Sequence, residues 1–157
     1  MNVKSLVGSS AAVMLGATIA LVVVLFLEWH RTSVEIAGVT SVQVDEPGWN
    51  GWGWLAGLAA ITLLAATFLR LPRGAELDPT FGIGALVLAV VMLCATVAAV
   101  YAGSADVQVG AAGAEASEIL WPAWAGLALA CVAACAAAVV ALPAAWQPSR
   151  RPSPTAA

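Results

Sequence analysis

The sequence predicts an all-α membrane protein: a bundle of four transmembrane helices with a small β-hairpin or sheet in its outer loops. Three observations support this fold class. Of the 157 residues, 62% are apolar and only 10% are charged, whereas soluble domains carry about 25% charged residues. Four long runs contain no charged residue and no histidine. A loop between two of these runs alternates β-branched and polar residues, as strands do.

Each apolar run is long enough to cross a bilayer, because about 30 Å of hydrocarbon requires about 20 helical residues. The predicted spans lie within one domain of residues 1–146 and cover residues 6–27, 52–69, 81–101 and 121–142. The first run is longer than the core of a secretory signal and ends without a small-residue cleavage site, so we expect an uncleaved helix.

Prolines mark several helix boundaries. Pro72 disfavours helix in the residue before it and closes the second span. Asp78 and Pro79 supply an N-cap carboxylate and a first-turn proline for the third span. Pro143 is expected to end or bend the fourth span.

The basic residues predict how the bundle is oriented. Arg31 lies on the outer side, and the other five lie on the opposite side: Lys4, Arg70, Arg73, Arg150 and Arg151. The positive-inside rule then places both termini in the cytoplasm of a multi-pass protein of the bacterial plasma (inner) membrane. The tail, residues 147–157, is rich in proline and serine, and we expect it to be disordered.

The first outer loop predicts a β-hairpin. Residues 32–36 and 41–44 alternate β-branched and polar side chains around Ala37 and Gly38. Residues 106–109 in the second outer loop repeat the pattern, and they form either a third strand or an extended loop.

Tryptophan marks the predicted membrane boundaries. Trp146 lies at the inner boundary, and six others lie at the outer one: Trp29, Trp49, Trp52, Trp54, Trp121 and Trp124. The favoured interpretation is an aromatic belt, because an indole carries both an apolar ring and a polar N–H. The alternative is a partner-binding surface, built from tryptophans and neighbouring glycines that allow close approach: Trp49, Trp52, Trp54, Gly51 and Gly53.

Small residues recur every four positions and predict closely packed helix faces. The candidate packing residues are Gly8, Ala12, Gly16, Gly57, Gly126 and Ala130. Packing within one chain is favoured, and contacts between chains are the alternative. Besides the lipid bilayer, the expected partners are therefore further copies of the chain or a larger membrane complex.

Two groups of residues could be reactive or bind a metal: a pair of cysteines, and a histidine with carboxylates nearby. Neither has the spacing expected of a thiol oxidoreductase or of a metal site. Cys131 and Cys135 lie one turn apart in a span, but a thiol far from positive charge stays protonated and unreactive. We therefore expect these thiols and Cys94 to be small packing residues. His30 has carboxylates nearby but no metal-ligand spacing, so we expect it at a solvated loop edge, where Arg31 neutralises an acidic residue. The carboxylates are Glu28, Glu35, Asp45 and Glu46, with Glu28 or Glu35 as the partner of Arg31.

Charged solutes cross bilayers beside ionisable side chains. The predicted spans contain no Asp, Glu, Lys, Arg or His. The leading hypothesis is therefore a non-enzymatic accessory or scaffold subunit, without cofactor or metal, that interacts through helix faces and the Trp/Gly-rich outer loop. Two alternatives remain: a small oligomeric transporter or pore component lined by Thr62, Thr67 or Thr96, and a membrane thiol oxidoreductase. The acidic pI of about 4.9 excludes nucleic acid as an expected partner.

Two short segments carry a resemblance. Phe26-Leu27-Glu28-Trp29 ends the first span, and Gly48-Trp49-Asn50-Gly51-Trp52 precedes the second. They resemble Phe-Leu-Pro-Trp and Gly-Trp-x-Gly elements in uncharacterised small four-helix membrane proteins of high-GC actinobacteria, with Glu28 in place of the proline. The architecture is also loosely similar to claudin-like tetraspans, although the loop cysteine pair of that family is missing. These resemblances imply a fold and transfer no catalytic residue.

Overall fold

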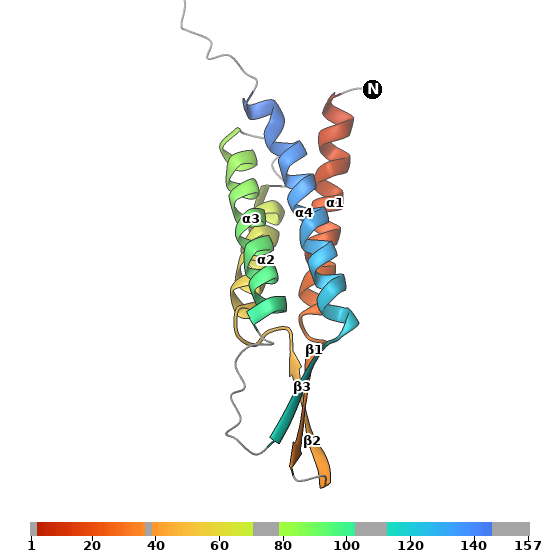
Figure 1. The fold of residues 1–157 in the computed structure, drawn as a ribbon. Helices are drawn as coiled ribbons and strands as arrows, with labels where there is room; N and C mark the ends of the chain where they lie inside the picture. The colour runs from red at the N-terminus through yellow and green to blue at the C-terminus, as the bar shows by residue number, and fades with distance from the viewer. Residues whose placement is uncertain (1–2, 37–38, 71–78, 103–112, 146–157) are drawn as a thin grey trace, which may run out of the picture.

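The computed structural model describes residues 3–36, 39–70, 79–102 and 113–145. Four helices lie side by side in a bundle, and a three-stranded sheet projects from one end of it (Figure 1). In chain order the elements are α1 (Val3–Val24), β1 (Glu28–Ile36), β2 (Val39–Pro47), α2 (Gly53–Arg70), α3 (Pro79–Ala102), β3 (Gly113–Ile119) and α4 (Trp121–Ala145).

Three of the helices, α2, α3 and α4, are long and apolar enough to cross a membrane, which indicates a membrane protein. Helix α1 contributes a shorter apolar segment, Gly8–Val24, within the described residues. The predicted first span, residues 6–27, is too long at its end. The backbone N–H groups of Phe26 and Leu27 bond to carbonyls only three residues back, and this tightened turn leads into β1 at Glu28.

The other helix boundaries lie within three residues of the predicted ones. Helix α3 begins at Pro79, as a first-turn proline predicts. Helix α4 continues through Pro143 to Ala145, so of the two expected effects of Pro143 the ending of the helix is wrong. A proline so near the end of a helix removes a single backbone hydrogen bond, which the last turn tolerates.

The sheet has the order β2-β1-β3, and both pairs are antiparallel. The predicted hairpin is confirmed as β1 and β2, and both strands extend further toward the bundle than predicted. The third strand is residues 113–119, whereas the predicted strand at 106–109 lies outside the described residues. Strand β3 reads Gly-Ala-Glu-Ala-Ser-Glu-Ile, which has low strand propensity, so its pairing with β1 left little signal in the sequence.

The helices form a closed ring in which α1 packs on α2 and α4, and α3 packs on the same two helices. Three buried clusters run along this bundle, and alanine dominates the first two. Small side chains let the helix backbones approach, and the resulting dispersion attraction holds helices together where lipid offers no hydrophobic drive. Met14, Leu63 and Met92 fill the remaining space and are at most 1% exposed.

The predicted packing residues divide between two environments. Gly57, Gly126 and Ala130 are buried, as expected for packing within the chain. The α1 residues Gly8, Ala12 and Gly16 are instead exposed, so packing of this stripe within the chain is wrong. Helix α1 turns a different stripe inward, in which Met14 and Leu21 fill the core. That stripe consists of Met14, Ala17, Thr18 and Leu21, and Leu25 continues it just after the helix.

The close approach at the start of α2 gives a paired prediction. A Cβ atom at Gly53 would overlap the carbonyl oxygen of Gly48, whereas a Cβ atom at Gly16 meets nothing within 4 Å. Gly53→Ala should therefore lower the free energy of unfolding by about 1–3 kcal/mol. Gly16→Ala should raise it by about 0.5–1 kcal/mol through helix propensity. Unfolding in mixed detergent micelles measures both, and shifts in the same direction would contradict the described backbone contact.

Candidate functional site

Trp29 lies at the junction between the bundle and the sheet and has no exposed surface. Its indole fills the space left by two glycines from distant parts of the chain. A Cβ atom at Gly126 would lie 2.6 Å from Cζ2 of the ring, and one at Gly48 would overlap the ring. The indole N–H donates to the carbonyl of Val24 at 2.9 Å. Trp29 therefore connects the end of α1, the β2–α2 loop and the first turns of α4.

This position corrects the interpretation of Trp29 as an anchor in the aromatic belt. The ring faces the chain itself, and its polar atom is satisfied within the chain. Only glycine leaves room for an indole at such short range, so Gly48 and Gly126 are the residues that allow Trp29 to be buried. Their role could not be predicted from the sequence, because they lie far apart along the chain and only the fold brings them together.

His30 is buried beside Trp29, with 5% of its surface exposed. Its Nε2 atom lies 3.0 Å from the carbonyl oxygen of Ala99. Because a carbonyl only accepts, Nε2 carries the proton and donates it. Ala99 belongs to the last four residues of α3, whose carbonyls lack partners within the helix. The side chain of His30 thus caps α3 from the sheet, and the expected solvated position of His30 is wrong.

Backbone hydrogen bonds complete the junction. The N–H of Leu120 donates to the carbonyl of Trp29 at 2.8 Å, which joins the start of α4 to β1. The N–H of Gly48 donates to the carbonyl of Leu27 at 3.1 Å, which joins the β2–α2 loop to the turn between α1 and β1. The segments that connect the helices to the sheet are therefore bonded to one another.

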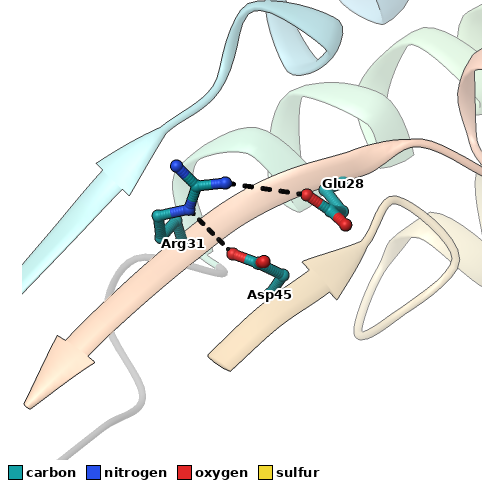
Figure 2. A network of polar contacts seen from close by, with 3 residues as sticks. All are labelled: Glu28, Arg31 and Asp45. Carbon is teal, nitrogen blue, oxygen red and sulfur yellow. Dashed lines mark hydrogen bonds and ion pairs between the residues drawn. The ribbon is translucent and has the colours of Figure 1, made fainter. Parts of the chain in front are cut away.

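Next to the junction, an ion-pair network lies on the sheet surface (Figure 2). Arg31 Nε donates to Asp45 Oδ1 at 2.9 Å, and its Nη2 lies 3.8 Å from Glu28 Oε2. The predicted pairing with Glu28 is present, but Asp45 is closer because the register places it directly opposite Arg31. The hydrogen bond and charge of Asp45 raise the pKa of Arg31. An exposed pair of this kind contributes little to stability, so it orders the strands more than it stabilises them.

In the loop that precedes α2, some of the predicted partner-binding residues pack against other residues of the chain itself. The ring of Trp49 packs on Gly57, and its centroid lies 5.3 Å from the centroid of the Phe26 ring. Gly53 is buried against Gly48, and Gly51 has a φ angle of 54°, which favours glycine.

Trp52 and Trp54 differ from Trp49 because they are 53% and 54% exposed. Of the predicted partner-binding tryptophans, these two are the ones whose rings face away from the chain. Binding through them stays a prediction.

The metal and thiol hypotheses can be compared with the geometry. The described residues contain no group of three or more His, Cys, Asp or Glu side chains placed to hold a metal. The side chain of Glu35 is not described, and Glu46 is half-buried in β2. All three cysteines are free and exposed on the outside of the bundle, so their expected packing role in the core is wrong: Cys94, Cys131 and Cys135.

The threonines of the transport hypothesis hydrogen-bond within their own helices. Thr67 and Thr96 are buried, and each donates to the carbonyl four residues earlier, at 2.7 and 2.8 Å. Thr62 is exposed on α2 and does the same at 2.8 Å. These bonds follow the usual behaviour of helical threonine, so the hydroxyl protons are already used.

The His30 cap gives a second prediction. His30→Leu leaves the Ala99 carbonyl without its donor and should lower the free energy of unfolding by about 1–3 kcal/mol. His30→Gln places an amide N–H near the position of Nε2 and should recover much of that loss. Thermal unfolding in detergent compares the two variants with the native chain. Equal stability of His30→Leu and His30→Gln would contradict the cap.

No protein-family model, curated protein or solved structure matches this chain. The resemblance of residues 26–29 and 48–52 to actinobacterial four-helix proteins therefore stays an expectation. In the described residues, those two segments meet at one place, since Trp29 and Gly48 are in contact. Function is accordingly inferred from the geometry of this junction and from the surfaces around it.

Proposed function

We propose that this protein is a non-enzymatic accessory or scaffold subunit of a membrane complex. The observation that carries this proposal is the burial of Trp29 and His30 where β1 leaves the bundle. Two consecutive buried side chains, each hydrogen-bonded to a helix carbonyl, hold the sheet in one orientation relative to the helices. A rigidly presented sheet suits a protein whose task is to position a partner.

The proposal includes four membrane spans. Helix α1 has 22 residues, and at about 1.5 Å per residue it is about 33 Å long, enough for the hydrocarbon. It packs against α2 and α4, which are both apolar enough to span. Lys4 in the first turn of α1 and Arg70 at the last residue of α2 lie at the end of the bundle opposite the sheet (Figure 1), so the positive-inside rule supports cytoplasmic termini in a plasma (inner) membrane.

Two exposed surfaces support contacts with other proteins. The sheet exposes Val44 of β2, which is 48% accessible, and it also carries the carboxylates of Glu28 and Asp45. On α1, the exposed small residues Gly8 and Gly16 leave space into which another helix fits. The first surface suits a soluble or extramembrane partner, and the second suits a further copy of the chain or another membrane protein.

A non-catalytic role is also supported by how the buried polar groups are used. The hydroxyls of Thr18, Thr67 and Thr96 donate to backbone carbonyls of their own helices. Catalysis requires a nucleophile, a base and an orienting group in reach of one another. These buried hydroxyls are used within their own helices, and in the described residues no hydrogen bond joins them to a base.

Site-specific photo-crosslinking in native membranes tests the proposal. A photoreactive amino acid replaces Val44 on the sheet or Ala12 on α1, and Val87 on the outer face of α3 serves as the control. A discrete adduct at Val44 or Ala12, absent at Val87, is expected, together with a native mass above that of the monomer in mild detergent. A monomer without adducts at either position would contradict the scaffold role.

A further inference from the structure

A collar of exposed aromatic side chains lies at the end of the bundle from which the sheet projects, on α2, α3 and α4. It comprises Trp52, Trp54, Tyr101, Trp121 and Trp124, which are 53%, 54%, 56%, 71% and 48% exposed. These residues come from the start of α2, the end of α3 and the start of α4, and all three helix ends lie next to the sheet (Figure 1). The collar excludes Trp29 and Trp49, whose rings pack within the chain.

The chemistry of the surface changes across this collar. On the bundle side, the exposed large side chains are aliphatic or phenylalanine, and on the sheet side the surface carries ion pairs and further carboxylates. The aliphatic residues include Leu58, Ile61, Val87, Val90, Val97 and Val132. On the other side lie Glu28, Arg31 and Asp45, and also Glu118, which faces solvent at the end of β3. Such a change from an apolar to a charged surface is what a membrane–water interface requires.

We propose that the aromatic collar binds the interfacial region of the outer leaflet, at the level of the phospholipid ester and headgroup atoms. An indole suits this layer because its ring is apolar and its N–H is a donor for lipid oxygens. Tyr101 and Trp124 pack edge to face, with ring centroids 6.4 Å apart, so two collar rings share a fixed arrangement. The collar continues the apolar outer faces of the three candidate spans and sets their depth.

The distance to the opposite end of the bundle agrees with one bilayer. Trp54 and Arg70 are 16 residues apart in α2, about 24 Å along the helix. Phe81 and Tyr101 are 20 residues apart in α3, about 30 Å. The guanidinium carbon of Arg70 lies 5.6 Å from the centroid of the Phe81 ring, so both helices mark the same inner level. The second length equals the hydrocarbon thickness of about 30 Å, and the first is somewhat shorter.

The collar should not select lipids by charge. It contains no basic residue, and Arg31 nearby is engaged by Asp45 and Glu28. We therefore assign the collar to zwitterionic and anionic phospholipids alike. This inference depends on the membrane assignment and not on the scaffold role, so each can fail without the other.

Depth-dependent fluorescence quenching tests the collar. The full chain carrying Trp146→Phe is reconstituted in phosphatidylcholine vesicles that contain nitroxide lipids, labelled near the headgroup or near the end of the acyl chain. The shallow label should quench tryptophan emission at least twofold more than the deep label. Replacing Trp52, Trp54, Trp121 and Trp124 by Phe should remove most of this quenching, because Trp29 and Trp49 are shielded. Trp121→Phe alone, the most exposed position, provides the same test with a minimal change.

Several results would overturn the proposal. Stronger quenching by the deep label would place the collar in the hydrocarbon, and quenching by aqueous iodide alone would place it in water. No quenching by either label, in a protein that sediments as a dimer, would assign the collar to contact with a second copy. Exchange of half the phosphatidylcholine for phosphatidylglycerol should leave quenching by the shallow label unchanged. A twofold rise in this quenching would contradict lipid binding that is independent of headgroup charge.

Discussion

The burial of Trp29 between Gly48 and Gly126 is the contact on which the arrangement of the molecule depends. Truncation of a buried aromatic ring usually costs about 3–5 kcal/mol, a large share of the stability of a small domain. Here the ring joins three segments that are distant in sequence. His30, the next residue, caps α3 and brings in the fourth helix of the junction. One dipeptide thus links the sheet to α1, α3 and α4 and to the loop that precedes α2, and the polar sheet keeps a defined place at the end of an apolar bundle.

The two ends of this arrangement have different chemistry, and that difference shapes the functional proposal. The bundle is held by alanine-rich contacts between helices. The buried threonine hydroxyls of Thr67 and Thr96 bond within their own helices. The sheet presents charge and an exposed valine edge. Between them, the aromatic collar matches the change from hydrocarbon to water. A molecule organised in this way is suited to holding an outer surface at a fixed height above the membrane.

Much of the fold was predictable because hydrophobic length and proline position are local signals. The bounds of α3 and the hairpin of β1 and β2 follow from such signals. The junction was not predictable, since it depends on contacts between distant residues. An indole beside a predicted span end is normally an anchor, and only the proximity of Gly126 shows that Trp29 is buried. Likewise, the small residues of α1 indicated a packed face, but the larger Met14 and Leu21 determine which face is buried.

The distance between the sheet and the bundle tests the rigid junction most directly. Spin labels at Val44 on β2 and Ile61 on α2, both exposed in the native chain, report this distance once the native cysteines are replaced by serine. Pulsed electron resonance in reconstituted vesicles should give one narrow distribution, which broadens when Trp29→Ala removes the ring. A broad distribution with Trp29 intact would show that the sheet moves freely, and it would contradict a rigid junction.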